Sequence, residues 1–146
     1  MTPLLDRAAI ASLIPHAGSM CLWHALWEAD DQRVRLTTDS HRDPQNPLRR
    51  EGRLAALHLL EYGAQAMAVH GGWMARSAGG GAQPGVLAAV RDLQLKVEWL
   101  ENLPDLLTCE AQRLVANAGG WMYSFVLRCG EREIASGRAS VIHLPT

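Results

Sequence analysis

The stretch GRLAALHLLEYGAQAMAVH, residues 52–70, carries the most regular helical pattern in the chain. Some of its residues recur at intervals of three and four, which places them on one helix face: Leu54, Leu57, Glu61, Ala64 and Ala68. Two glycines follow at positions 71 and 72, and glycine is typical of the residue that ends a helix. The pattern therefore predicts one long helix over residues 52–70, with this face buried against a sheet.

The segments on both sides of this helix alternate apolar and polar residues, which is the period of a β-strand. Before it we expect a short helix, a hairpin and a long loop, over residues 3–13, 22–38 and 39–51. After it we expect consecutive strands over residues 86–100, 106–116, 121–129 and 133–144. This order predicts a single α+β domain over residues 1–146, in which a curled antiparallel sheet wraps around one long central helix.

The composition argues against several classes of protein. Apolar residues make up 48% of the chain and charged residues 20%, which fits an ordinary soluble globular protein. The formal net charge of -1 argues against nonspecific binding to nucleic acid, which needs a basic surface. No apolar run approaches the ~20 residues of a membrane-spanning helix. We therefore expect neither nucleic acid nor a membrane as a partner.

The cysteines and histidines indicate the compartment and the absence of a metal. The 3 cysteines lack CxxC spacing, and the chain shows no secretory signal pattern. Reduced thiols in a cytoplasm are the simplest interpretation. The 6 histidines have no zinc-ligand spacing with cysteines or acids. We expect a cytoplasmic protein with no metal and no other cofactor.

Two residues are candidates for acid–base chemistry. His16 follows a proline in the turn-rich segment LIPHAGSM, residues 13–20, and Glu61 lies on the predicted buried face of the helix. Burial there would favour the neutral, protonated acid. A base and an acid on separate elements indicate proton transfer in an apolar cleft. Structural roles stay open: His16 could cap its turn, and Glu61 could reach the surface or pair with an arginine.

These two segments resemble motifs of the hotdog 3-hydroxyacyl-acyl-carrier-protein dehydratases. Residues 13–20 are similar to the motif (L/I)PH-x-x-x-(M/F), and LEYGAQAMA, residues 60–68, is similar to the central-helix motif (I/L)E-x-x-AQ. The resemblance covers nearly the whole chain. It is strongest to a compact branch of stand-alone dehydratases, often associated with polyene-pigment or lipid gene clusters. The resemblance implies the hotdog fold.

The resemblance also implies roles for particular residues in forming a trans-2-enoyl thioester. His16 would remove the C2 proton of a 3-hydroxyacyl thioester, and Glu61 would protonate the departing 3-hydroxyl. Gln65 would support the acid. Backbone amides at the predicted start of the helix, at Ala56 and Leu57, would hold the thioester oxygen. An apolar tunnel beside the helix would hold the acyl chain, and its candidate lining residues are Met20, Trp23, Trp27, Met67 and Trp73.

The resemblance implies partners as well. The substrate would be carried on the 4'-phosphopantetheine arm of an acyl carrier protein. In the family the histidine and the acid come from different subunits, so the resemblance implies an obligate dimer. Homodimers, higher oligomers and hetero-oligomers with another hotdog subunit all stay open. The cluster of Arg49, Arg50 and Arg53 is a solvated loop or a contact for an acidic partner.

Two other functions stay open beside the dehydratase. A hotdog thioesterase would hydrolyse the same thioester in the same pocket. A non-catalytic subunit would pair with an active hotdog dehydratase. The second interpretation is motivated by Ala55 and Ala56, which stand where the best-known branch has a Pro-Gly pair.

Overall fold

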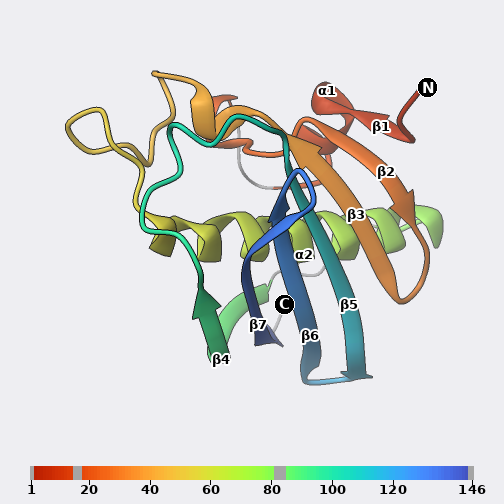
Figure 1. Cartoon of the computed structure of the whole chain (residues 1–146). Coiled ribbons are helices and arrows are strands. Elements are labelled where there is room, and N and C mark those ends of the chain that lie inside the picture. The colour runs from red at the N-terminus through yellow and green to blue at the C-terminus, as the bar shows by residue number, and fades with distance from the viewer. Residues whose placement is uncertain (1, 15–17, 81–84, 145–146) are drawn as a thin grey trace.

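The computed structural model describes residues 2–14, 18–80 and 85–144 (Figure 1). It contains a 7-stranded antiparallel sheet in the order β1-β2-β3-β5-β6-β7-β4, together with two helices and three short 3-10 turns. The strands are β1 (Leu5–Asp6), β2 (Ala25–Ala29), β3 (Arg33–Thr38), β4 (Gly85–Leu95), β5 (Leu107–Asn117), β6 (Gly120–Cys129) and β7 (Arg132–His143). The helices are α1 (Arg7–Ala11) and α2 (Leu59–Ser77), and the turns are η1 (Gly18–Met20), η2 (Ser40–Arg42) and η3 (Ala56–His58).

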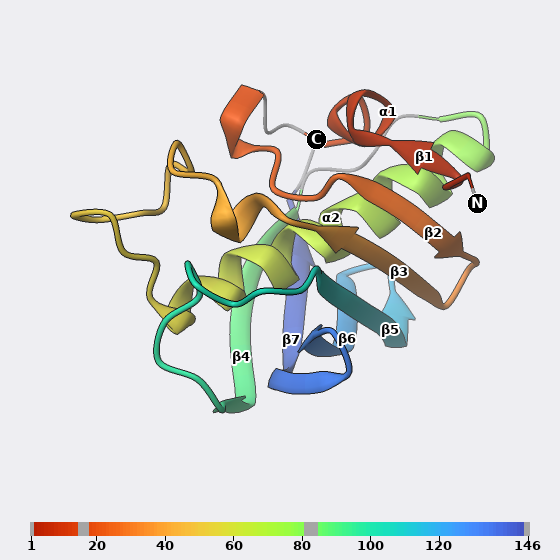
Figure 2. The same ribbon diagram turned by 45° about the horizontal axis from the view of Figure 1, so that its top comes forward.

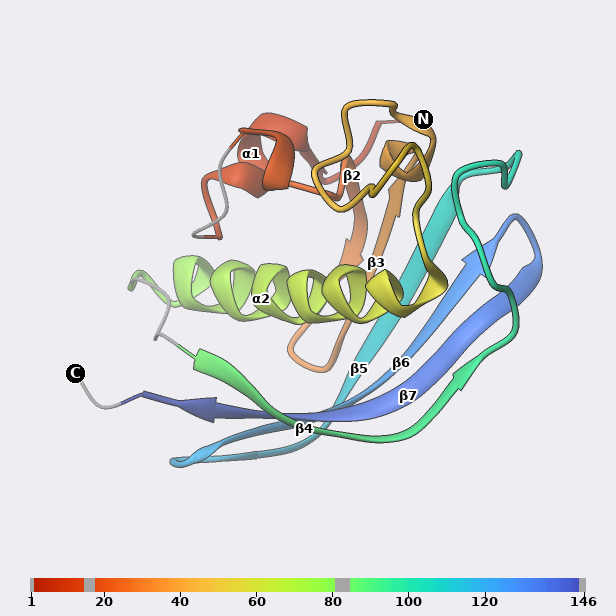
Figure 3. The ribbon, with the colours of Figure 1, turned by 90° about the vertical axis from the view of Figure 1, so that its left-hand side faces the viewer.

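The sheet curls around α2, as Figure 3 shows, so the predicted architecture is confirmed. The strands predicted after the helix are all present, and β5, β6 and β7 begin and end within one residue of their predicted bounds. The short N-terminal helix is α1, where the Asp6 carboxylate accepts a hydrogen bond from the Ala9 amide at 2.9 Å and so caps the first turn. Figures 1 and 2 place α1 beside the C-terminal half of α2.

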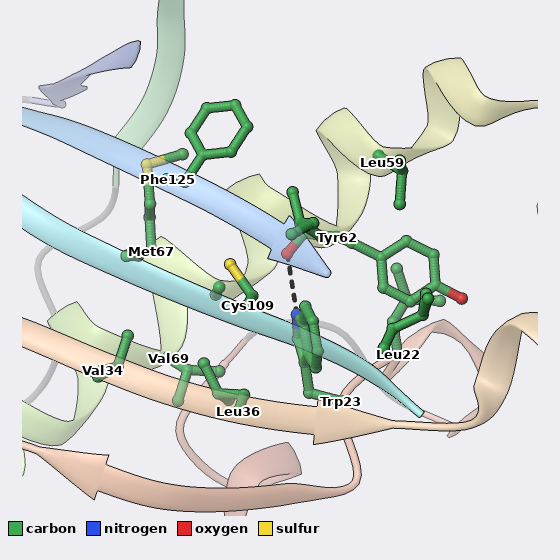
Figure 4. Close-up of a cluster of buried hydrophobic side chains, with 14 of the residues drawn as sticks. Leu22, Trp23, Val34, Leu36, Leu59, Tyr62, Met67, Val69, Cys109 and Phe125 are labelled. Carbon is green, nitrogen blue, oxygen red and sulfur yellow. Dashed lines mark hydrogen bonds between the residues drawn. The ribbon is translucent and has the colours of Figure 1, made fainter. Parts of the chain in front are cut away.

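The face of α2 that enters the core differs from the predicted one. Leu59, Tyr62, Ala66 and Val69 are fully buried, while Glu61 is exposed. These buried residues form a second regular seam, and they pack with residues of β3, β5 and β6 that include Leu36, Cys109 and Phe125 (Figure 4). The Tyr62 hydroxyl lies 2.8 Å from the Ser40 hydroxyl and accepts from the Asn46 amide at 3.1 Å, so its polar end is satisfied inside the core. The larger side chains of this seam explain why it is the one that is buried.

The α-helix also begins later than predicted. The backbone of residues 54–56 bonds to the segment after β4: the Leu100 amide donates to the Leu54 carbonyl at 2.8 Å, and the Ala56 amide donates to the Glu98 carbonyl at 2.9 Å. The Glu101 carboxylate accepts from the Leu54 amide at 2.8 Å. Backbone groups used in this way cannot join a helix, so α2 starts only after the η3 turn.

The prediction that the helix ends at Gly71 and Gly72 is wrong, because α2 continues to Ser77. A β-carbon at position 71 would lie 2.9 Å from the Trp121 ring, and one at position 72 would lie 2.5 Å from the Leu13 carbonyl oxygen. The two glycines therefore allow β6 and the N-terminal segment to approach the helix closely.

Strand β4 lies at the free edge of the sheet and is shorter than the predicted strand over residues 86–100. It pairs with β7 through Leu95, after which the chain turns back toward residues 54–56. Most of its side chains are exposed, including the apolar Val86, Leu87 and Leu95. In the part of the chain that the structure describes, neither helix is long and apolar enough to cross a membrane.

Candidate active site

A cavity of about 500 Å³ lies along one side of α2. Its lining is mainly apolar and comes from the N-terminal segment, α2, β4, β6 and β7: Leu13, Met20, Leu22, Glu61, Ala64, Gln65, Met67, Ala68, Gly71, Gly72, Gly85, Val86, Leu87, Trp121, Val141 and His143. A volume of this size is typical of sites that hold a small ligand. The predicted face that is not buried in the core, with Glu61, Ala64 and Ala68, is thus the wall of this cavity.

Glu61 is an acidic residue in the cavity lining and lies in the first turn of α2. Its side chain is exposed in the single chain, so the expectation that it is buried in the core is wrong. The exposed position leaves its carboxyl group accessible to a ligand in the cavity. The predicted helix face with Ala64 and Ala68 exists, but it lines the cavity instead of packing in the core.

Gln65 lies one turn after Glu61 and is almost fully buried. Its side-chain oxygen accepts a hydrogen bond from the Leu22 amide at 2.6 Å, and its side-chain nitrogen donates to the Met20 carbonyl at 2.7 Å. Both bonds join α2 to the segment between η1 and β2. Gln65 therefore supports the site by fixing this segment beside Glu61.

His16 falls in residues 15–17, outside the described part of the chain. The described residues on either side of this segment include Leu13 and Met20, and both line the cavity.

The amides of Ala56 and Leu57, which were predicted to hold a thioester oxygen, belong to residues outside the described cavity lining. The Ala56 amide already donates to the Glu98 carbonyl at 2.9 Å, and Ala56 is buried. The Leu57 side chain is 58% exposed. Among the described residues, neither Ala56 nor Leu57 lines the cavity. The Ala56 amide is therefore engaged in the fold.

Trp23 is fully buried in the core and does not belong to the described lining of the cavity. Its indole N–H donates to the Tyr62 carbonyl at 2.8 Å, as Figure 4 shows, and the two rings meet edge to face at 5.5 Å. Met20, by contrast, is one of the residues that line the cavity. Trp23 contributes to the site by holding the first turns of α2 in place.

The sequence analysis did not identify Trp121 and His143, which line the cavity at the end of α2 that carries Gly71. Their rings meet edge to face with centroids 4.7 Å apart. They are distant in sequence and come together because β6 pairs with β7. Identifying this pair requires the register in which the two strands pair, and the periodicity of each strand does not give that register.

The three arginines at positions 49, 50 and 53 make contacts within the fold. Arg49 and Arg50 donate to backbone carbonyls of the surrounding loop. Arg53 pairs with Glu101 at 3.1 Å and stacks on the Trp99 ring at 3.7 Å. Within the described residues, no cluster of histidine, cysteine or acidic side chains could hold a metal ion.

Comparisons with known proteins give a family and a fold. The family model described as ApeP-like, ApeP dehydratase, matches residues 8–145. No curated protein matches the chain. Among solved structures, the chain is similar to one from the dehydratase heterocomplex ApeI:P of Xenorhabdus doucetiae, with a TM-score of 0.84 and 19% identity over 94% of this chain and 91% of that chain.

Two further solved structures are similar. A sigma28-regulated virulence protein from Campylobacter jejuni has a TM-score of 0.62 and 13% identity, over 99% of this chain and 94% of that chain. A hypothetical thioesterase from Streptococcus pneumoniae, solved with coenzyme A, has a TM-score of 0.57 and 15% identity, over 83% of this chain and 85% of that chain. These likenesses confirm the predicted hotdog fold.

Proposed function

Because the chain belongs to the ApeP-like dehydratase family, we propose that it removes water from 3-hydroxyacyl thioesters and forms trans-2-enoyl thioesters. The observation that carries this proposal is Glu61, an accessible carboxyl group on the wall of an apolar cavity. The cavity provides room for an acyl chain beside that group. The substrate is proposed to be bound to an acyl carrier protein through its 4'-phosphopantetheine arm, as the resemblance implies.

Dehydration needs a base for the C2 proton and an acid for the departing 3-hydroxyl. We assign the base to His16, because a neutral imidazole has a ring nitrogen that can accept a proton. We assign the acid to Glu61. The proton that His16 takes from C2 and the proton that Glu61 gives to the hydroxyl leave one water molecule and a C2–C3 double bond.

The thioester oxygen also needs hydrogen-bond donors as charge develops on it. The Ala56 amide is engaged with Glu98, so we assign this role to the Leu57 amide, which lies one turn before Glu61 and outside the described cavity lining. This amide lies near the positive end of the dipole of α2, which stabilises negative charge.

We further propose that the active protein is a dimer or a larger oligomer that forms through the free edge of β4. This strand has 11 residues, and in the described part of the chain it pairs on one side only. Long, exposed strand edges with apolar residues promote association. The partner is a second copy or another hotdog subunit, and the similar ApeI:P structure is a heterocomplex.

Because the three cysteines are buried and unpaired, we place this assembly in the reducing cytoplasm.

Mass spectrometry of a 3-hydroxyacyl-carrier-protein tests the function directly. The purified protein should remove one water molecule, and both Glu61→Gln and His16→Ala should abolish this loss. Glu131→Gln is the matched control, because Glu131 is exposed in the turn between β6 and β7. Full turnover by Glu61→Gln and His16→Ala would contradict the proposed roles.

The same experiment separates two other candidates. Loss of the whole acyl group, with release of a free thiol, would indicate a thioesterase, and the likeness to a hypothetical thioesterase favours including this readout. The engaged Ala56 amide favours testing for a non-catalytic subunit. An unchanged mass with the isolated protein, and water loss only after addition of another hotdog subunit, would assign that role.

A further inference from the structure

Two aromatic rings line the part of the cavity near Gly71, ten residues along α2 from Glu61. The Trp121 ring approaches the backbone of α2 so closely that a β-carbon at position 71 would lie 2.9 Å from it. The His143 ring meets it edge to face at 4.7 Å, and the guanidinium of Arg113 lies 5.0 Å from the ring centroid. The indole is thus held between a helix, a neighbouring strand and a cation.

Between Glu61 and this part, Ala64 and Ala68 of α2 line the cavity with small side chains, and Gln65 and Met67 line it with larger ones. Ala64, Ala68 and Gly71 follow Glu61 at intervals of three, four and three residues, and all of them line the cavity. Ten residues of α-helix span about 15 Å. An extended acyl chain that starts at Glu61 therefore runs along α2, past Met67, and then reaches the Trp121 ring.

We propose that Trp121 is a specificity-determining residue, which sets the longest acyl chain that the cavity accepts. This inference rests on the proposed function, in which the reacting carbons lie at Glu61. The thioester end of the substrate remains there, and the chain terminus points toward Trp121. Gly71 contributes to the same limit, because its lack of a side chain leaves the space that the Trp121 indole occupies.

The chemistry of the lining supports a limit on chain length. Trp121 is a rigid ring, and its movement is restricted by His143 and by α2. An apolar pocket can discriminate between two substrates that differ by one methylene group by about 10–200-fold. A chain that is too long must displace the ring or leave its own terminus in water, and both lower its affinity.

Binding of unreactive ligands tests this inference. The probes are amide analogues of acyl-pantetheine with saturated chains of increasing length, and their affinity is measured by calorimetry with the full-length protein. Affinity for the wild type should rise with length and then fall beyond a limit. Trp121→Ala should move this limit to longer chains, with a gain of at least about tenfold for the first chain that the wild type rejects.

Gly71→Ala should move the limit in the opposite direction, because its methyl group must push the indole into the cavity. Trp73→Ala is the matched control and should keep the wild-type limit, since Trp73 packs against the core outside the described cavity lining. If Trp121→Ala fails to fold by circular dichroism, Trp121→Leu replaces it. An unchanged limit in the Trp121 and Gly71 variants would overturn the inference.

The outcome is distinguishable from failure of the proposed function. The probes cannot lose water, so a shifted limit without any dehydration of 3-hydroxyacyl chains would support Trp121 as the end wall and reject the dehydratase. Dehydration with the same chain-length limit in every variant would support the dehydratase and reject the role of Trp121.

Discussion

Gln65 connects the two segments that build the candidate site. Replacing it by glutamate would keep an acceptor for the Leu22 amide but remove the donor to the Met20 carbonyl. An introduced carboxylate would then face a carbonyl oxygen in a buried position. Such an unsatisfied contact costs about 1–3 kcal/mol.

We predict that Gln65→Glu is destabilised at neutral pH and recovers on acidification. The fold would raise the pKa of the introduced carboxyl group through burial and the facing carbonyl, so the folded variant binds more protons than its unfolded chain. Its protonated form can donate to the Met20 carbonyl as the native amide does. Urea unfolding at pH 7.5 and pH 5.5, in the wild type and the variant, measures this. A difference in stability that does not shrink on acidification would contradict the role of the Met20 bond.

His70 is fully buried on the core side of α2. Its Nε2–H donates to the Asp30 carbonyl at 2.7 Å, so its Nδ1 accepts from the Tyr123 hydroxyl at 2.6 Å. Burial, aided by the charge of Arg113, holds the pKa of His70 below its ordinary value, although the Asp30 carbonyl opposes this shift. The neutral imidazole is therefore part of the folded structure.

This histidine predicts a loss of stability in acid. Because its folded pKa lies below the unfolded value of ~6.5, the unfolded chain binds more protons just below that pH. The stability due to neutral His70 is complete above about pH 6.5 and is lost as the pH falls below it. Melting temperatures from pH 7.5 to pH 5 should fall less steeply for His70→Gln than for the wild type. A residual slope is expected because burial also lowers the pKa of His41. Equal slopes would contradict the assignment.

At the scale of elements, α2 shows that glycine has different roles within one helix. A β-carbon at position 63 would lie 3.4 Å from the Phe125 ring, which is an ordinary contact, whereas one at position 72 would lie 2.5 Å from the Leu13 carbonyl oxygen. Alanine is favoured over glycine in a helix by about 1 kcal/mol. The two positions therefore form a matched pair with opposite expected results.

We predict that Gly63→Ala maintains or raises stability, while Gly72→Ala lowers it by about 1–3 kcal/mol, as overpacking does. The reason at position 72 is that α2 and the N-terminal segment would have to separate. The free energy of unfolding, measured by urea denaturation of the wild type and both variants, tests this prediction. If Gly72→Ala were as stable as Gly63→Ala, the close approach of Leu13 would be wrong.

At the scale of the whole molecule, the exposed edge of β4 predicts how subunits associate. Ala89 lies exposed near the middle of this strand, and Ala116 lies exposed on β5, away from the edge. A lysine at position 89 would place a charge in the proposed interface without disturbing the core. We predict that Ala89→Lys lowers the molecular mass in solution, measured by light scattering, while Ala116→Lys keeps the wild-type mass. An oligomer that Ala89→Lys leaves intact would require another interface.

The order of elements could be predicted because hydrophobic periodicity is a local property. The four strands after the helix and the strand at residues 33–38 were identified from alternation alone. Local patterns were insufficient where distant groups compete for the backbone. The start of α2 depends on bonds from residues 54–56 to residues 98–101, and the glycines predicted to end it instead allow Trp121 and Leu13 to approach the helix.

The order of the elements, the long helix and the motif that places Glu61 and Gln65 one turn apart could all be read from the sequence. Which helix face enters the core depends on contacts between distant parts of the chain. Two seams have helical spacing, and the buried one is the seam whose Tyr62 finds space beside the sheet and polar partners in Ser40 and Asn46 after β3. Burial of that seam turns Glu61 away from the core and makes it part of the cavity wall. Packing is a property of surfaces that meet, so a pattern along one chain segment cannot specify it.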